Sequence, residues 1–227
     1  DLLTMVKTIV VFDHHRQSSE TIQGAVLSYC EPYASSASEL IAEMMQYIRE
    51  GIKAKPIEAD CMYGGIVIDT REFTNQTGVR TFEAAAYLRR CGADIIRIRK
   101  TFREDFIDYQ AKADTISKAD IYREYYAIST LERAGTESPT VLCAKAANEL
   151  LNIRGIKASI VLTKVEDTVF LSARSIDELN VQVLMEKLGG GGHRTVAGAQ
   201  MKGFTIEECI DKVRAAIDEM IEEGEVE

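Results

Sequence analysis

The sequence lacks several features that would place it in familiar classes of protein. No apolar run is long enough to cross a bilayer and no signal peptide is present, so we expect a cytoplasmic domain. The five cysteines are scattered without any CxxC pair, which argues against a zinc ribbon and for reduced thiols. Internal repeats and low-complexity tracts are also missing. The composition is otherwise that of a folded protein, with 46% hydrophobic and 28% charged residues.

Positive charge is scarce as well, because the net charge is -9 and no block rich in Lys and Arg occurs. Affinity for long DNA or RNA depends largely on neutralising phosphates, so the composition argues against a protein that tracks along nucleic acid. A small anionic substrate still fits if positive charge is local or is supplied by a metal. The first residue is Asp1 rather than Met, which indicates a piece of a longer chain.

Histidine is rare, with three in the chain, yet two are adjacent in Asp13-His14-His15-Arg16, directly after the apolar residues 9–12. The apolar run predicts a short buried strand, and ligands and metals collect at strand ends in open α/β sheets. Successive side chains on a strand point to opposite faces, so the two imidazoles cannot both approach one ion in the same way. We predict one metal ligand and one partner imidazole oriented by Asp13, in preference to a polar surface strand end.

A second acid, Asp69, stands at the end of the apolar run that begins at Tyr63-Gly64-Gly65. The glycines allow close backbone approach, as at a ligand site. Taken alone, Asp69 is more typical of a helix cap or a turn. Its pairing with His14 makes it a candidate metal ligand.

Helix and strand signals divide the chain into two α/β halves. A charge-rich amphipathic stretch, 103–119, predicts a helix that links a domain at 1–102 to a domain at 120–227. The remaining expected elements are a strand near 24–29, a helix capped by Ser36 with Glu39 and ended by Gly51, helices after Pro56, at 81–90 and from Ile95 behind Asp94, a strand at 122–131, a helix from Ser138-Pro139, a hairpin of 158–165 and 168–172, and a helix at 181–188 capped by Asn180.

Four consecutive glycines, 189–192, precede His193. Such a run costs backbone entropy, and its physical use is to let a ligand approach bare N–H groups that form an anion-binding nest. Arg174 can fork onto a phosphate, and His193 can bind a phosphate or stack on a base. A flexible linker is the alternative, but the flanking helix and apolar strand favour a binding loop.

With these two groups of residues in place, the sequence resembles the DHH–DHHA1 phosphoesterases over essentially its whole length. Asp13-His14-His15 and Asp69-Thr70 match the DHH motifs, while Ser172-Ala-Arg-Ser175, Asn180 and the glycine run with His193 match the DHHA1 domain. The resemblance implies a DHH domain with a largely parallel sheet flanked by helices, and a smaller α/β DHHA1 domain with a mixed sheet.

Within the family, the stretches 12–16 and 31–36 resemble the GdpP-type cyclic-di-AMP phosphodiesterases. That group is anchored in the bacterial membrane through an upstream part that carries a PAS domain and a degenerate GGDEF domain. The resemblance implies two Mn²⁺ ions per complete site, a water that attacks the phosphodiester, and 5'-pApA as product. It implies metal ligation by His14 and Asp69, catalytic support by Asp13 and His15, and substrate binding by Arg174, Ser175, Asn180, Gly190, Gly191, Gly192 and His193.

One departure from the family pattern is expected to matter. Family members carry a His-x-x-x-Asp-x-Asp motif and a further aspartate before the DHH strand, and neither is present here. We therefore expect this chain alone to bind Mn²⁺ weakly and not to turn over substrate. A nanoRNase or pAp phosphatase of the same superfamily and a nucleotide-binding module without catalysis stay open as alternatives, as does a homodimer.

Overall fold

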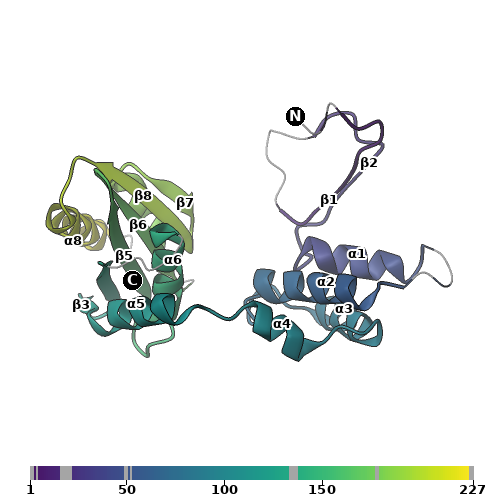
Figure 1. The fold of residues 1–227 in the computed structure, drawn as a ribbon. Coiled ribbons are helices and arrows are strands. Elements are labelled where there is room, and N and C mark those ends of the chain that lie inside the picture. The colour runs from purple at the N-terminus through teal and green to yellow at the C-terminus, as the bar shows by residue number, and fades with distance from the viewer. Residues whose placement is uncertain are drawn as a thin grey trace. The chain divides into compact units, whose positions relative to one another are not determined.

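A computed structural model describes residues 3, 5–15, 22–48, 51, 53–132, 138–176 and 179–224 (Figure 1). The chain divides into two compact units, Asp1–Arg103 and Glu104–Glu227. Arg16, predicted to belong to the first motif, lies outside the described residues. Within the described ranges, no helix combines the length and the apolar character that a membrane crossing requires.

Two parallel strands begin the first unit, β1 (Val10–Asp13) and β2 (Leu27–Cys30). Their parallel pairing confirms the expected α/β sheet, although β1 begins one residue later than predicted. The prediction of a buried strand is wrong, because Val10 is 49% exposed and Leu27 45% exposed. Among the described residues β1 pairs with β2 alone, so neither strand is covered as parallel strands usually are.

Helices α1 (Ala37–Met45), α2 (Pro56–Asp69), α3 (Val79–Arg90) and α4 (Ile95–Thr101) pack around one apolar cluster. Ser36 caps α1 as predicted, its hydroxyl accepting from the backbone N–H of Glu39 at 3.0 Å. The Asp94 carboxylate caps α4 through the N–H groups of Ile96 and Arg97. Helix α1 ends at Met45, ahead of the predicted stop at Gly51, and the Glu39 carboxylate binds Ser35 instead of completing a capping box.

Helix α2 contains the apolar run that leads to Asp69. A side chain at Gly64 would press against the Phe102 ring at 3.2 Å, and one at Gly65 would meet the Ser38 hydroxyl at 2.5 Å. The glycines therefore allow close approach of neighbouring helices within the fold, in place of the ligand contact that the sequence suggested. Asp69 is the last residue of this helix.

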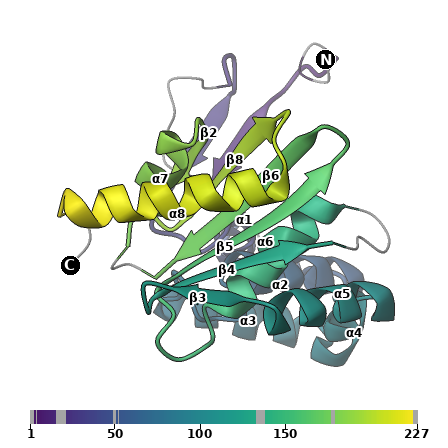
Figure 2. The ribbon, with the colours of Figure 1, turned by 90° about the vertical axis from the view of Figure 1, so that its left-hand side faces the viewer.

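The second unit is built on one six-stranded sheet in the order β3-β4-β5-β6-β8-β7 (Figure 2). Only β4 and β5 are parallel, so the expected mixed sheet is confirmed. One face packs on α5 and α6 and the other on α7 and α8. The elements are α5 (Phe106–Ser117), β3 (Asp120–Tyr122), β4 (Tyr126–Leu131), α6 (Pro139–Leu150), β5 (Ala158–Val165), β6 (Thr168–Ser175), α7 (Val181–Lys187), β7 (Gly191–His193), β8 (Val196–Lys202) and α8 (Ile206–Glu222).

Most sequence signals in this unit place the elements correctly. The hairpin of β5 and β6 turns at Glu166 and Asp167, and α6 starts at Pro139 behind Ser138. The single strand predicted at 122–131 is instead two antiparallel strands, because Arg123 and Glu124 take left-handed conformations in a turn. Helix α5, which covers most of the predicted linker, contacts α6 and β4.

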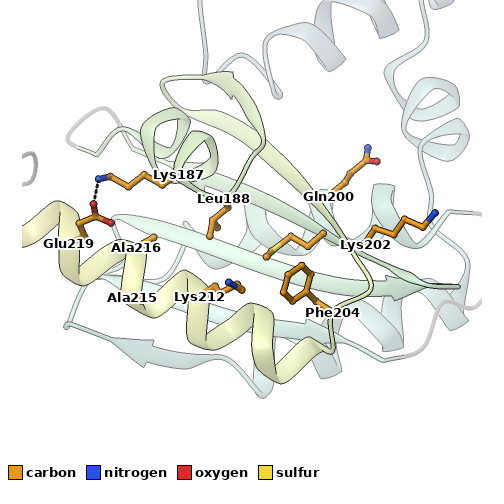
Figure 3. Close-up of a pocket in the computed structure, with 10 residues that line it drawn as sticks. Lys187, Leu188, Gln200, Lys202, Phe204, Lys212, Ala215, Ala216 and Glu219 are labelled. Carbon is orange, nitrogen blue, oxygen red and sulfur yellow. Dashed lines mark ion pairs between the residues drawn. The ribbon is translucent and has the colours of Figure 1, made fainter.

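Strand β8 extends beyond the short strand β7. The register pairs β7 with residues 196–198, and no described strand pairs with the outer edge of residues 199–202. A pocket of about 450 Å³ lies beside this edge, between α7 and α8 (Figure 3). Lys187 at its rim pairs with Glu219 at 3.1 Å, and the hydrogen bonds that its ammonium donates to Glu223 and Glu219 raise the pKa of Lys187. None of the predicted site residues lines this pocket.

The first unit contains an ion pair that ties α2 to α4. The buried Asp60 carboxylate accepts from Arg97 and, at 2.7 Å, from the backbone N–H of Asp94. The hydrogen bond from Arg97 is the main cause that lowers the pKa of Asp60. Because the pKa of Asp60 is lower in the folded state than its ordinary value, the ion pair stabilises the fold at pH values above the ordinary pKa. This stabilisation is lost as the pH falls through the folded-state pKa.

We expect Asp60→Asn to lower the free energy of unfolding at about pH 7 and to approach the wild type toward about pH 2. Urea denaturation at a series of pH values measures the difference. The matched control is Glu83→Gln on the exposed side of α3, which should change little at any pH. A constant difference between Asp60→Asn and the wild type across the series would contradict the role of the charge.

Candidate functional site

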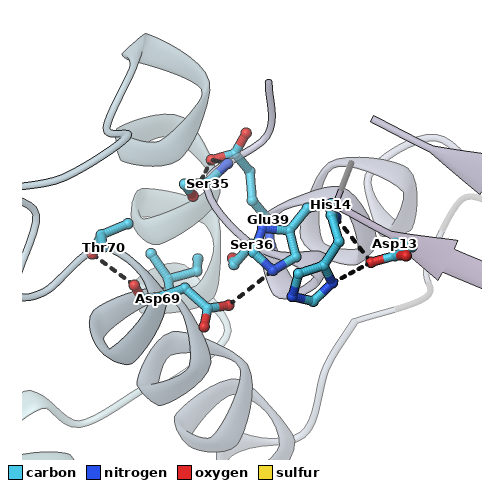
Figure 4. A network of polar contacts seen from close by, with 9 residues as sticks. Asp13, His14, Ser35, Ser36, Glu39, Asp69 and Thr70 are labelled. Atoms are coloured by element: carbon cyan, nitrogen blue, oxygen red, sulfur yellow. Dashed lines mark hydrogen bonds and ion pairs between the residues drawn. The ribbon is translucent and has the colours of Figure 1, made fainter. Parts of the chain in front are cut away.

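His14 and Asp69 come together from distant parts of the chain (Figure 4). His14 directly follows β1, Asp69 ends α2, and His14 Nε2 lies 3.7 Å from Asp69 Oδ2. The His14 side chain is 16% exposed and that of Asp69 is 37% exposed, so both reach solvent. This separation is long for a hydrogen bond, whereas two ligands of one hard divalent ion, each about 2.1 Å from it, lie roughly 3 to 4 Å apart.

Asp13 and His15 form a second pair beside the first. Asp13 Oδ1 accepts from the backbone N–H of His15 at 3.0 Å and lies 2.6 Å from His15 Nδ1. The backbone hydrogen bond, followed by the side-chain bond, lowers the pKa of Asp13. The two imidazoles thus have different carboxylate partners, His14 with Asp69 and His15 with Asp13. Asp13 thus orients one imidazole as predicted, but the two histidines follow β1 and their ring centroids lie 4.5 Å apart, so the expected separation onto opposite faces of a strand is wrong.

The loop after β2 lies next to these pairs. Its backbone is fixed to β1 by the bond from Glu31 N–H to the Asp13 carbonyl at 2.9 Å, and Cys30 Sγ donates to the His15 carbonyl at 3.1 Å. Further along, the Ser35 hydroxyl donates to the buried carboxylate of Glu39 at 2.5 Å (Figure 4). Sequence reasoning recognised this segment as a helix start and missed that it lies against the histidines.

The turn after Asp69 is strained. Arg71, Glu72 and Phe73 have φ values of 47°, 58° and 64°, a left-handed conformation that costs energy in residues other than glycine. The buried hydroxyl of Thr70 stabilises the turn, donating to the Ile66 carbonyl at 2.7 Å and accepting from the Phe73 N–H at 2.9 Å. No residue type in this stretch signals the left-handed turn, so the sequence could not predict it.

The donor set fits a divalent metal in part. An imidazole and a carboxylate suit Mn²⁺ and similar ions. Across the part of the chain that the structure describes, however, no group of three or more His, Cys, Asp or Glu side chains converges. His14 and Asp69 could therefore supply two ligands to a metal, fewer than a complete site needs.

In the second unit, Arg174 and His193 lie on one face of the sheet. Both face Val196 in the strand register, Arg174 from β6 and His193 from β7, and directly opposed residues of antiparallel strands share a face. Arg174 Nε donates to Asn148 Oδ1 of α6 at 3.1 Å, which identifies this as the α6 face. Val196 is half-buried and His193 exposed, so α6 leaves this part of the face open.

Ser175 and Asn180, also predicted to bind substrate, have structural contacts. The buried Ser175 Oγ lies 2.7 Å from the Leu179 carbonyl and 3.2 Å from the Arg194 carbonyl. Asn180 Oδ1 accepts from the Gln182 N–H at 3.1 Å and so caps α7, as the sequence predicted. The Ser175 side chain thus ties the end of β6 to Leu179, and the Asn180 side chain stabilises the start of α7.

The glycine run is not the free loop that the sequence suggested. Gly189 (φ +79°) ends α7, its N–H donating to the Glu186 carbonyl, and Gly190 N–H donates to the Met185 carbonyl in a Schellman arrangement. A side chain at Gly190 or Gly192 would collide with the backbone of β8. Gly191 alone among the four combines an ordinary φ with open space around its missing side chain.

Comparison with known proteins agrees with this arrangement. Residues 2–66 match the model of the DHH family, N-terminal domain, and residues 124–223 match that of the DHHA1 domain. The chain therefore carries the N-terminal domain of the DHH family, followed by a DHHA1 domain.

Two curated relatives are similar to almost the whole of this chain. The chain is 44% identical over 224 residues to the cyclic-di-AMP phosphodiesterase GdpP of Geobacillus thermodenitrificans, covering 98% of this chain and 34% of the relative. It is 43% identical over 219 residues to the cyclic-di-AMP phosphodiesterase PdeA of Listeria monocytogenes, covering 96% of this chain and 33% of the relative. The chain thus spans about a third of the length of these enzymes.

A solved structure shows the same fold. An exopolyphosphatase-related protein of Bacteroides fragilis matches with a TM-score of 0.78 at 22% identity, over 93% of this chain and 63% of that chain. The prediction of an α/β fold of the DHH–DHHA1 type is therefore confirmed.

The glycine contacts predict unequal effects of substitution. We expect Gly192→Ala to lower the free energy of unfolding by about 1–3 kcal/mol, because the new methyl group meets the backbone of β8. Gly191→Ala, in open space, should stay within about 0.5 kcal/mol of the wild type. Thermal or urea denaturation measures both, and equal losses would contradict the described packing of β7.

Proposed function

We propose that this chain is the catalytic region of a Mn²⁺-dependent phosphodiesterase that hydrolyses cyclic-di-AMP to 5'-pApA. The observation that carries the proposal is the convergence of His14 and Asp69 at 3.7 Å, beside the Asp13–His15 pair. The names of the relatives support the substrate, since GdpP and PdeA are cyclic-di-AMP phosphodiesterases. A nanoRNase or pAp phosphatase would use the same motifs.

In this proposal, the residues of the first unit have two roles, metal binding and phosphate contact. His14 and Asp69 would hold the metal, which when bound supplies charge to the phosphodiester and acidifies a water. Asp13 fixes the ring of His15 through Nδ1, and the His15 side chain is 77% exposed. His15 would therefore present its other ring nitrogen to a phosphate oxygen.

The second unit would bind the nucleotide. Arg174 supplies a guanidinium and His193 an exposed imidazole on the open part of the α6 face. Gly191 has open space where a side chain would stand, which leaves room for a ligand on this face. Together these groups would offer a phosphate positive charge and room to approach the backbone. Ser175, Asn180, Gly190 and Gly192 would support the segments that form this surface.

In this proposal, the region described here is the cytoplasmic part of a longer protein. An upstream part with a PAS domain and a degenerate GGDEF domain would anchor it in the bacterial membrane. The share of about a third that the chain covers in its relatives supports a longer parent. A homodimer is compatible with the proposal.

Hydrolysis by the longer protein tests the reaction. With Mn²⁺ present, we expect kcat/KM to be highest for cyclic-di-AMP and lower for pApA and pAp, and His14→Ala or Asp69→Asn to reduce it at least 100-fold, as loss of a metal ligand should. The exposed Tyr47→Ala is the control. A preference for pAp would favour the phosphatase alternative. Robust turnover by the 227-residue chain alone would contradict our expectation that two converging ligands are too few.

Nucleotide binding by this chain in the presence of a chelator tests the second unit separately. We expect calorimetry with pApA to show binding that Arg174→Ala weakens about tenfold or more, because a guanidinium is lost from a phosphate contact. The control is Arg154→Ala, an exposed arginine of the same unit. Equal affinities of the two variants would contradict the proposed site and leave the metal site untouched.

A further inference from the structure

A groove of about 560 Å³ lies in the first unit between the loop after β2 and the segment that follows α2. Its walls are aromatic. The Phe73 and Phe82 rings are stacked, with centroids 5.6 Å apart and planes inclined by 15°. Tyr33 forms the opposite wall with Pro32. The groove is thus bordered by flat rings from three places in the sequence.

The exposure of these rings calls for an explanation. Tyr33 is 92% exposed and Phe82 56% exposed, so burial of Tyr33 contributes almost nothing to the stability of the fold. Phe73, by contrast, rests edge-on against Tyr63 with centroids 6.0 Å apart, which anchors the stacked pair to the helical core. A rigid ring pair and an exposed ring that line the same groove can receive a further flat group.

The backbone holds this wall at an energetic cost. Phe73 lies in the left-handed region at φ 64°, and Gln76, which also lines the groove, has φ 44°. Such conformations are unfavourable for residues other than glycine and are frequent at ligand sites. Two of the residues that line the groove thus have strained backbones.

Both walls continue from segments that carry the candidate catalytic residues. Tyr33 stands three residues after Cys30, which pairs with Asp13 in the sheet, and Phe73 stands four residues after Asp69. The strained turn joins Asp69 directly to the ring pair. A molecule whose phosphate is held by His14 and Asp69 therefore has this groove as a neighbouring surface of the same unit.

We propose that the groove is a nucleobase site, in which a base stacks among Tyr33, Phe73 and Phe82. Among the described residues, no charged side chain lines it, which favours a neutral flat group over a phosphate. Gln76 and Thr77 at the rim offer an amide and a hydroxyl to the edge of a base, and amides pair well with adenine. The inference rests on the proposed function, since it names where that site holds one base of its nucleotide.

The first experiment measures binding without turnover. In an Arg174→Ala background, which removes the site proposed in the second unit, AMP is titrated into the chain and its Kd is determined. Tyr33→Ala should raise the Kd about tenfold, as expected for the loss of one base–aromatic stack. Tyr47→Ala, whose ring is 87% exposed and does not line the groove, is the matched control and should leave the Kd unchanged.

A second experiment locates the base directly. The chain is irradiated with 2-azidoadenosine 5'-monophosphate, and the labelled peptides are identified by mass spectrometry. Label on the peptides containing Tyr33 or Phe82, competed by AMP, supports the inference even if cyclic-di-AMP proves not to be the substrate. Unchanged AMP affinity in Tyr33→Ala, together with no label at these peptides, overturns it even if the longer protein hydrolyses cyclic-di-AMP.

Discussion

Close packing around helix α2 is the constraint on which the first unit depends. Gly64 brings the helix against Phe102, Gly65 brings it against the start of α1, and Ile66 is buried completely in the cluster between them. Since Asp69 ends the same helix, the packing that stabilises the unit also fixes the carboxylate that faces His14. A shift of the helix by one residue would rotate Asp69 by about 100° and separate the pair.

The two units carry their candidate sites in different ways. In the first, side chains at the ends of a strand and a helix meet, and two carboxylates assign different partners to two adjacent histidines. In the second, the backbone matters as much, because a glycine-containing strand lies beside an arginine and an imidazole on an open sheet face. The candidate groups of the first unit are thus carboxylates and imidazoles, and those of the second are a guanidinium, an imidazole and a glycine with open space beside it.

Local sequence signals anticipated much of the fold. Ser36, Asp94 and Asn180 cap helices as predicted because capping needs only the residue and its next neighbours along the chain. The pairing of His14 with Asp69 was also anticipated, from the motif resemblance. The sequence did not anticipate three other features: the exposure of β1, the left-handed turn after Asp69 and the different structural roles of the four glycines. Each of these depends on contacts between distant segments.

The short strand β7 bears on how readily the chain can aggregate through its sheet edge. Because it leaves the outer edge of residues 199–202 without a described strand partner, that edge could serve as a template for a foreign strand. Lys202 stands on this edge with an exposed ammonium, and a second strand of the same kind would bring two such charges together. A charged side chain at the place where the sheet stops disfavours edge-to-edge pairing of this kind.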